Sequence, residues 1–515
     1  MLRKGRIVTH SVLIPAIVFA LLLGSAHPAH GQEALLHIFS TISNDGVSPE
    51  SSLIFDSAGN IYGTTASGGQ YGYGTVYELL AGTWEENILY SFTGGSDGGN
   101  TASNVIFDSK GNLYGTTPVG GAYNGGVLFE LSPVGTGWAE TVLHSFGGPG
   151  DGIGPASGVI MDPKTGNLYG MTGGDYYQTD IPPTVYEVSL SGGSWVESII
   201  YTFPSYDGHF DNVAFSTLTM DAAGNIYGNS SLEVLELSPN GLGGWNPTTL
   251  HRFTGPPKDG WDANGTPVLD SAGNLYGATG LGGSKNCGTV YKLSPGKKGK
   301  WTEKILYSFA CTVGSQPVSG IVLDAELNIY GTLEDGGSLG DGSVYELVAP
   351  VGRGAYKEKT LFSFDGWANP PQYKDGAYPL ANLIWDSAGN LYGTTAGGGS
   401  TGSLINGCGT GCGVVFEVNP SAAATTTTLS SSLNPSIYGE AVTFFAVVAP
   451  APPDGETVTF LDGSTELGTG NLSGGSASLT TSSLAVGTSK ITAVYGSDFD
   501  FGGSTSNTVK QVVKK

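Results

Sequence analysis

Asp56-Ser-Ala-Gly-Asn60-Ile-Tyr62-Gly63 is the stretch that decides the fold, because close variants of it recur along the chain. Short apolar runs stand on both sides of each copy, so the stretch joins two strands. An Asp side chain can hydrogen-bond the backbone that follows it, and Gly takes the positive φ that a bulged turn needs. The stretch therefore predicts a β-hairpin. The seven copies begin at Asp56, Asp108, Asp162, Asp221, Asp270, Asp324 and Asp386.

A calcium loop is the alternative to the turn, because Asp and Asn both offer oxygen donors. Calcium loops need several further carboxylates at fixed spacing, and the Ser-Ala-Gly between Asp56 and Asn60 supplies none. Two copies depart from the pattern: Asp162-Pro-Lys-Thr-Gly166 has one more residue, and Asp324-Ala-Glu-Leu327 lacks the Gly. A turn accommodates both changes more easily than a metal site does, so the sequence favours the turn.

Each copy is the start of a longer unit. A Gly-Gly loop follows it, then a strand such as Gly74-Thr-Val-Tyr-Glu-Leu79, a turn with a Trp, and a strand such as Ile88-Leu-Tyr-Ser-Phe92. A period of roughly 50 to 60 residues marks propellers, solenoids or arrays. Four short antiparallel strands per unit are typical of a β-propeller blade. A solenoid has shorter coils and comes second.

The count of units predicts how the ring closes. The seventh unit ends at Val414-Val-Phe416-Glu-Val418, and Ser, Ala and Thr follow in place of a fourth strand. Leu35-Leu-His-Ile-Phe39 matches the fourth strands of other units, such as Leu143-His-Ser-Phe146. We therefore expect an all-β, seven-bladed propeller over residues 33–420, closed by its N-terminal strand, which removes open edges. The fourth unit has Asn229-Ser-Ser-Leu232 in place of the Gly-Gly loop, which predicts a shorter loop and a notch.

The repeated residues resemble a known family. Gly-Asn-Leu-Tyr-Gly-Thr-Thr, Gly-Gly, Gly-Thr-Val-Tyr-Glu-Leu, Trp and Leu-Tyr-Ser-Phe, in this order, are similar to the bacterial GloVer tandem repeat, which occurs in secreted "choice-of-anchor" proteins. The resemblance covers nearly the whole ring. It implies the fold and export from the cell, and it implies no activity.

The C-terminal part has a different composition. From about Thr425 a Thr-rich and Ser-rich stretch leads into alternating runs such as Val442-Thr-Phe-Phe-Ala-Val447 and Ile491-Thr-Ala-Val-Tyr495. About seven short strands in some 90 residues predict a β-sandwich over residues 424–515. Leu433-Asn-Pro-Ser-Ile-Tyr-Gly-Glu440 resembles bacterial Ig-like repeat domains, which act as spacers or adhesion units.

The N-terminus predicts a secretory signal peptide over residues 1–31. Arg3, Lys4 and Arg6 precede an apolar stretch that is too short for a confident membrane span, and small residues follow it. We expect a secreted or cell-surface protein without a membrane span in the mature chain. The formal net charge of −23 argues against nucleic acid and anionic membranes as partners.

Four cysteines suit an oxidising compartment. Cys287 opens one predicted strand and Cys311 closes the next, so antiparallel pairing brings them together. A local disulfide between Cys408 and Cys412 is geometrically possible. A metal site of all four thiolates is the rival, and the absence of paired C-x2-C spacings argues against it.

The loops that lead into the first strand of each unit, called lead-in loops below, are the best place for a ligand. Aromatic rings beside carboxylates suit sugars, or a ring of carboxylates could bind a cation or a polyhydroxylated ligand. The alternative is that each Asp-Gly only forms a turn. Asp-Gly occurs at Asp45, Asp97, Asp151, Asp207, Asp259 and Asp375, and the candidate ligand-binding residues are Asp207, His209, Asp259, Trp261, Trp367, Tyr373 and Asp375.

The sequence offers little for catalysis and no motif that holds a cofactor or metal. His37, His144 and His251 stand where other units have Tyr or Ile, so we expect them to be structural. The leading hypothesis is a non-enzymatic binding or adhesion protein that has extracellular polysaccharide or surface proteins as partners and needs no cofactor. One alternative is a carbohydrate-active hydrolase or lyase using paired carboxylates such as Asp207 with Asp259. The other is a structural scaffold of the cell envelope.

Overall fold

The regular structure of the chain is all β, apart from one 3-10 turn at Lys297–Gly299. The predicted signal peptide lies outside the described residues. Within the described part of the chain, no helix is long and apolar enough to span a membrane. The computed structural model describes residues 33–42, 44–155, 157–174, 181–206, 209–210, 217–312, 314–337, 340–364, 366, 375–399, 408, 411–423, 425–496 and 500–515.

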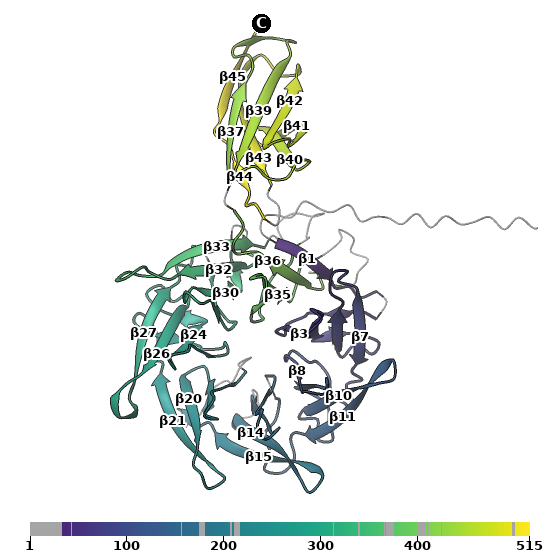
Figure 1. Ribbon diagram of the computed structural model, residues 1–515, viewed down its shortest axis with the longest axis vertical. Helices are drawn as coiled ribbons and strands as arrows, with labels where there is room; N and C mark the ends of the chain where they lie inside the picture. The colour runs from purple at the N-terminus through teal and green to yellow at the C-terminus, as the bar shows by residue number, and fades with distance from the viewer. Residues whose placement is uncertain are drawn as a thin grey trace, which may run out of the picture.

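Seven four-stranded antiparallel sheets, numbered here in chain order as sheets 1 to 7, make up the larger part of the molecule. Figure 1 shows them around a common centre, with β3 and β8 near the centre and β7, β11 and β15 at the rim. The strands, sheet by sheet, are β3 (Ile54–Phe55), β4 (Ile61–Thr65), β6 (Thr75–Leu79) and β7 (Glu86–Ser91); β8 (Ile106–Phe107), β9 (Leu113–Thr117), β10 (Val127–Val134) and β11 (Gly137–Ser145); β12 (Ile160–Met161), β13 (Leu168–Thr172), β14 (Thr184–Ser191) and β15 (Ser194–Thr202); β18 (Thr219–Met220), β19 (Ile226–Asn229), β20 (Glu233–Pro239) and β21 (Trp245–Arg252); β23 (Val268–Leu269), β24 (Leu275–Thr279), β26 (Thr289–Pro295) and β27 (Trp301–Ser308); β29 (Val322–Leu323), β30 (Ile329–Leu333), β32 (Ser343–Val348) and β33 (Lys357–Ser363); and β34 (Ile384–Trp385), β35 (Leu391–Thr395), β36 (Val414–Val418) and β1 (Glu33–Ile38).

The repeated Asp stretch forms the predicted hairpin turn between the first two strands of each sheet. In sheet 1, Oδ1 of Asp56 accepts hydrogen bonds from the backbone N–H of Ala58 (2.8 Å) and Asn60 (2.9 Å), and Oδ2 accepts from the Asn60 amide and the Tyr62 hydroxyl. Gly59 has the expected positive φ of 86°. The carboxylate is therefore used by the turn itself, which confirms the turn over the calcium loop.

The Gly at the end of the stretch makes room for an aromatic ring. A Cβ on Gly63 would overlap the ring of Tyr77 on the neighbouring strand, and Gly393 faces Phe416 in the same way. The ring of Tyr77 then meets Phe39 of the adjacent sheet, with centroids 5.1 Å apart. At every junction except the one before sheet 4, the Phe that ends the Leu-Tyr-Ser-Phe run and an aromatic residue of the next sheet thus pack together.

The N-terminal strand completes sheet 7. β1 pairs with β36 in antiparallel register, with Glu33 opposite Val418 and Ile38 opposite Val414. The first and last sheets also meet through the Thr394 hydroxyl, which donates to the carbonyl of Ser51 at 3.2 Å.

Sheet 4 departs from the others as its sequence predicts. β19 ends at Asn229 and β20 begins at Glu233, so the connection is shorter than the Gly-Gly loop between β4 and β6. The junction partner on β20 is Leu235, which packs with Phe203 in place of an aromatic pair. The predicted notch stays a prediction.

Both predicted disulfides are present, between Cys287 and Cys311 and between Cys408 and Cys412. They exclude the alternative of a four-thiolate metal site.

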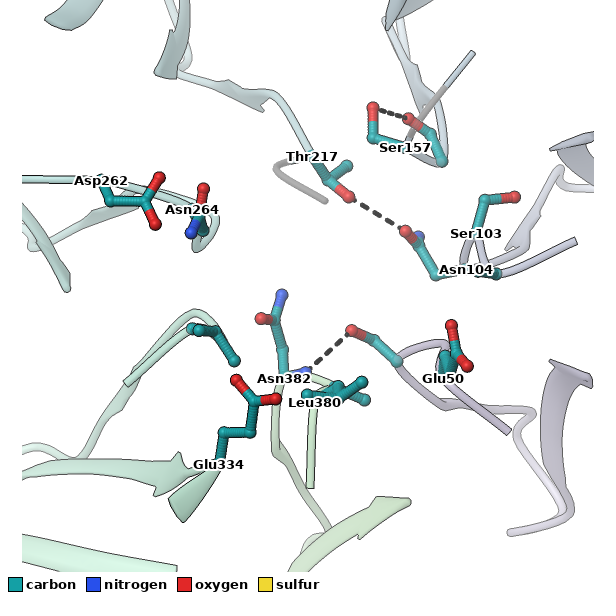
Figure 2. Close-up of a pocket in the computed structure, with 15 residues that line it drawn as sticks. Glu50, Ser103, Asn104, Ser157, Thr217, Asp262, Asn264, Glu334, Leu380 and Asn382 are labelled. Atoms are coloured by element: carbon teal, nitrogen blue, oxygen red, sulfur yellow. Dashed lines mark hydrogen bonds between the residues drawn. The ribbon is translucent and has the colours of Figure 1, made fainter. Parts of the chain in front are cut away.

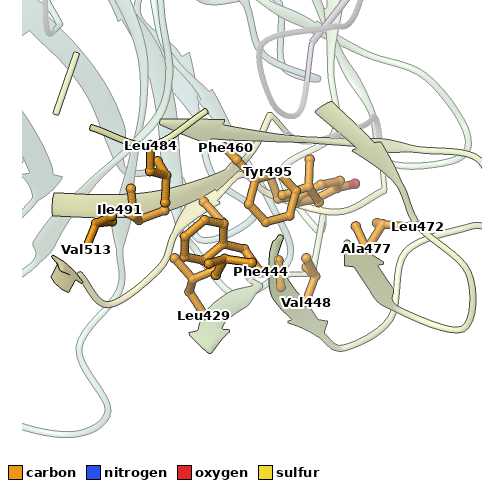
Figure 3. Close-up of a cluster of buried hydrophobic side chains, with 14 residues drawn as sticks. Leu429, Phe444, Val448, Phe460, Leu472, Ala477, Leu484, Ile491, Tyr495 and Val513 are labelled. Carbon is orange, nitrogen blue, oxygen red and sulfur yellow. The ribbon is translucent and has the colours of Figure 1, made fainter. Parts of the chain in front are cut away.

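The C-terminal residues form a β-sandwich, which extends from the ring beside sheet 7 (Figure 1). Its core holds Phe444, Phe460 and Tyr495, which lie between the two sheets (Figure 3). One sheet holds β37 (Thr426–Ser431), β39 (Val442–Ala449) and β42 (Ser476–Thr481); the other holds β38 (Ser436–Ile437), β40 (Thr457–Asp462), β41 (Thr465–Asn471), β43 (Gly487–Tyr495), β44 (Ser504–Thr505) and β45 (Val509–Lys514).

Candidate functional site

A cavity of about 300 Å³ lies where the seven sheets converge, and we call it the central cavity. The residues that line it come mostly from the lead-in loops, because the innermost strands are only two residues long and these loops reach the centre. Every sheet contributes at least one lining residue. In order from sheet 1 to sheet 7, examples are Glu50, Asn104, Ser157, Thr217, Asp262, Glu334 and Asn382 (Figure 2).

The lining of the central cavity is polar and acidic. Glu50, Asp262 and Glu334 bring three carboxyl groups, and none of the fifteen lining residues is Lys or Arg. Amides and hydroxyls provide most of the remaining polar groups, from Asn104, Asn264, Asn382, Ser52, Ser103, Ser157 and Thr217. This set of donors and acceptors suits a small hydroxylated molecule or a cation and disfavours an anion.

Hydrogen bonds across the ring fix part of the lining. The hydroxyl of Thr217 in the sheet 4 loop donates to the amide oxygen of Asn104 in the sheet 2 loop at 3.0 Å. The backbone N–H of Asn382 donates to the hydroxyl of Ser52 at 3.2 Å, and its side-chain amide donates to Thr266 at 3.1 Å. The contacts of Thr217 with Asn104 and of Asn382 with Thr266 join non-neighbouring sheets, and they hold the two amide groups in place before any ligand arrives.

Two of the cavity carboxyl groups are harder to ionise than usual. Burial raises the pKa of Glu50. Burial, and then the charge of Asp335, raises the pKa of Glu334. The pKa of both groups therefore lies above that of an exposed glutamate.

The residues expected to bind a ligand fall into two groups. Asp207, Trp367 and Tyr373 lie outside the described residues, and the described backbone of His209 belongs to the short strand β17 (His209–Phe210). Asp259 is buried and accepts hydrogen bonds from the backbone and hydroxyl of Thr254, at 2.8 and 2.9 Å. Asp375 is also buried.

Trp261 lies at the surface, in the lead-in loop of sheet 5. Its side chain is 40% exposed, and the following residue, Asp262, lines the cavity. A Cβ on Gly255 would contact its ring, so the indole rests on the lead-in loop. Tyr123 has a similar place in sheet 2, over Gly148, and is 59% exposed. Both rings are partly exposed, as stacking on a sugar requires.

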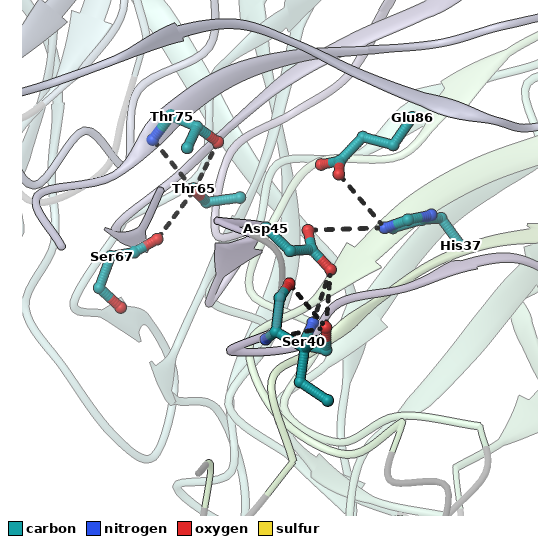
Figure 4. Close-up of polar contacts among 8 residues, drawn as sticks. His37, Ser40, Asp45, Thr65, Ser67, Thr75 and Glu86 are labelled. Carbon is teal, nitrogen blue, oxygen red and sulfur yellow. Dashed lines mark hydrogen bonds and ion pairs between the residues drawn. The ribbon is translucent and has the colours of Figure 1, made fainter. Parts of the chain in front are cut away.

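A second set of sites was not predicted from the sequence: three clusters of one His, one Asp and one Glu. Each cluster lies between two sheets, with the His on the outer strand of one sheet, the Asp on the loop that follows, and the Glu on the outer strand of the next sheet. Figure 4 shows the cluster of His37, Asp45 and Glu86, called the seam cluster because it joins sheets 7 and 1. The other two are His144 with Asp151 and Glu197, and His251 with Asp259 and Glu303.

A β-bulge aims the His side chains into the clusters. The register shifts just before the His position in β1, β11 and β21, and the other four sheets have the same bulge before Tyr or Phe. Between sheets 1 and 2, for example, the Tyr90 hydroxyl donates to Asp97 at 3.0 Å and Glu140 lies nearby. The sequence does contain a pattern that indicates these clusters: in most units a Glu stands four residues before the His or Tyr.

The clusters concentrate acidic groups that are partly shielded from water. Burial, and then the nearby Asp, raises the pKa of Glu140, Glu197 and Glu303 to about 7 in each case. Burial, and then Asp45, raises the pKa of Glu86 well above its ordinary value. The expectation that His37, His144 and His251 are structural is compatible with their place between sheets, and the clusters also offer metal ligands.

Comparison with known proteins identifies two regions. The sequence model of the Gloeobacter/Verrucomicrobia repeat matches residues 23–236 and 233–437, and that of the bacterial Ig-like domain (group 3) matches residues 426–514. No curated protein matches the chain.

Among solved structures, the extracellular domain of a hybrid two component system from B. thetaiotaomicron has a TM-score of 0.42 at 12% identity, covering 94% of this chain and 59% of that one. A polysaccharide lyase of family PL25, an ulvan lyase, has a TM-score of 0.42 at 12% identity over 64% of this chain and 86% of the lyase. A gluconolactonase from Xanthomonas campestris has a TM-score of 0.30 at 12% identity over 49% of this chain and 71% of that one. Values this low carry no inference about activity.

Proposed function

Since this chain belongs to the Gloeobacter/Verrucomicrobia repeat family and ends in a bacterial Ig-like domain, we propose that it is an extracellular, non-enzymatic binding protein. Its seven sheets form a seven-bladed β-propeller that β1 closes, and the Ig-like sandwich acts as a spacer or adhesion unit. The predicted signal peptide and the two disulfides support an extracellular location.

The proposed ligand is a neutral or amino-bearing carbohydrate, held at the central cavity. The observation that carries this proposal is the polar lining to which all seven sheets contribute, with three carboxyl groups and no Lys or Arg. A volume of about 300 Å³ is at the lower end of the roughly 300–1,000 Å³ of ligand sites, so it suits one or two sugar units or the end of a glycan. Trp261 offers a stacking face beside the cavity for the next unit.

A hydrolase or lyase is less well supported. Of the suggested pair, Asp207 lies outside the described residues, and the carboxylate of Asp259 is held by Thr254, His251 and the backbone of Gly260. A general acid or nucleophile has to reach the substrate, and these contacts hold the Asp259 carboxylate at the junction between sheets 4 and 5.

The test is a glycan-array screen of the tag-free protein, followed by calorimetry on the glycans that bind. We expect neutral or amino-bearing glycans to bind and anionic ones to be excluded. A Glu50→Gln, Glu334→Gln double variant keeps the shape of the cavity and removes two carboxyl groups. We expect it to weaken binding about tenfold or more, since a hydrogen bond to a charged group contributes ~1.5–3 kcal/mol.

The control is Glu466→Gln, an exposed position on the Ig-like sandwich, which leaves binding unchanged. If Trp261→Ala weakens binding and the double cavity variant does not, the ligand binds at the loop surface and not in the central cavity. If the wild-type protein binds no glycan, the carbohydrate ligand is excluded and the envelope scaffold becomes the leading function.

A further inference from the structure

The seam cluster contains three polar atoms that face one another without a hydrogen bond. Nε2 of His37, Oδ1 of Asp45 and Oε1 of Glu86 are shielded from solvent, and none has a hydrogen-bond partner among the described residues. Nε2 lies 3.7 Å from the Asp45 carboxylate and 4.0 Å from that of Glu86. Leaving one buried polar atom unpaired costs free energy, so the unpaired Nε2 of His37 and Oδ1 of Asp45, 3.7 Å apart and beside Glu86, indicate a shared partner.

The spacing suits a metal ion better than a direct hydrogen bond. Hydrogen bonds between nitrogen and oxygen span about 2.7–3.2 Å, so both distances are too long. Zinc binds nitrogen and oxygen at about 2.0–2.2 Å, which puts two ligand atoms of a tetrahedral site about 3.4 Å apart. The ligand atoms of the seam cluster all lie within 4.8 Å of one another, so small side-chain rotations bring them to that geometry.

We propose that His37, Asp45 and Glu86 bind one divalent transition-metal ion of the zinc class, which fastens the N-terminal strand of sheet 7 to sheet 1. One imidazole and two carboxylates form a donor set that suits such ions, and a water would complete the coordination.

The surroundings of the cluster orient one of its ligands. The second oxygen of Asp45 accepts hydrogen bonds from the backbone N–H of Ser40 (2.8 Å) and from its hydroxyl (3.2 Å), which orient the carboxylate (Figure 4). The three side chains are 12–18% exposed, so the cluster lies just below the surface.

The other two clusters differ from the seam cluster in the contact between the His and the Asp. His144 lies 2.9 Å from Asp151 and His251 lies 3.3 Å from Asp259, so each His is already hydrogen-bonded to its Asp. The junction between sheets 1 and 2 shows that Tyr fits the same position, because Tyr90 there bonds to Asp97. His37→Tyr is therefore a substitution that the fold already uses.

The test is calorimetric titration of the tag-free, chelator-stripped protein with zinc chloride, together with thermal unfolding. We expect one saturable zinc ion per chain at this site and a melting temperature that zinc raises by about 3 °C at a hundredfold excess over Kd. His37→Tyr should weaken zinc binding by more than about a hundredfold and abolish the thermal shift while the apo protein stays folded. His144→Tyr and His251→Tyr are matched controls that should keep both effects.

Three results would overturn the proposal. The first is a wild-type protein that binds no zinc. The second is a folded His37→Tyr variant that binds zinc as the wild type does. The third is a loss of binding in His144→Tyr or His251→Tyr with His37→Tyr unaffected. Glu86→Gln gives an independent check, because it removes one ligand charge without touching β1, and unchanged affinity in that variant would remove Glu86 from the site.

Discussion

At the scale of single residues, the buried tyrosines of the third strands show how the repeat balances packing against polarity. Tyr77, Tyr186, Tyr291 and Tyr345 fill the space above a Gly, and their hydroxyls have no hydrogen-bond partner within the described structure. Sheets 2 and 7 place Phe129 and Phe416 at the same position. The ring is therefore what this position requires, and the hydroxyl adds a desolvation cost.

We expect Tyr291→Phe to leave the free energy of unfolding unchanged or to raise it by up to about 1 kcal/mol, because it removes an unpaired buried hydroxyl. Tyr276→Phe is the matched control, since the Tyr276 hydroxyl donates to Asp270 at 3.1 Å. Its loss should cost about 1 kcal/mol. Urea unfolding measures both, and a clear destabilisation by Tyr291→Phe would show that its hydroxyl has a partner.

At the scale of elements, the junctions between outer strands set how stability depends on pH. Glu140 on β11 faces Asp97 and Tyr90 of the preceding junction, and its pKa is raised from 4.5 to about 7, first by burial and then by Asp97. Between pH 4.5 and a pH of about 7, Glu140 therefore holds its proton in the folded state and has lost it in the unfolded state. The free energy of unfolding falls as the pH rises through this window and levels off above it.

Glu140→Gln removes this contribution, because glutamine does not titrate. We expect the variant to match the wild type at pH of about 4.5 and to have a higher melting temperature at pH of about 8. Thermal unfolding at both pH values measures the difference. The exposed Glu466→Gln serves as control, and an equal response of the two variants would contradict the role of the junction.

Elements also show what the sequence could and could not predict. The hairpin turns, the β1–β36 pairing, the short loop of sheet 4 and both disulfides follow from local residue chemistry and from counting repeats. The seam cluster does not, because its Glu86 comes from a different sheet than His37, and a strand bulge decides which way His37 points. The central cavity is lined largely by the lead-in loops, where the sequence analysis expected a ligand, yet Glu50 and Asn382 were not named, because the sequence does not show which loop side chains reach the centre.

At the scale of the whole molecule, a few residues join sheet 7 to sheet 1. Phe39 is buried, meets Tyr77 across the seam, and belongs to the same cluster as Tyr392. We expect Phe39→Ala to lower the free energy of unfolding of the ring by about 3–5 kcal/mol, the usual cost of such a cavity. Ile42→Ala, at an exposed position three residues on, should change it by no more than about 0.5 kcal/mol.

Urea unfolding followed by intrinsic fluorescence measures both variants. Equal stabilities would mean that β1 is dispensable and that the ring does not depend on its N-terminal strand.

The pairing of β1 with β36 also determines how the molecule carries mechanical load. The Ig-like sandwich follows directly after β36, and Ala423 of the connecting segment is tied to it by backbone hydrogen bonds with Asp500 and Gly502. A pull on the sandwich thus reaches the ring through β36, which lies between β35 and β1. To pull out this interior strand, a force has to break its hydrogen bonds with β35 and with β1 at the same time. A strand at the edge of the sheet would have to break its hydrogen bonds with only one neighbour. The N-terminal strand β1 thus supports β36, the strand through which a force on the sandwich reaches the ring.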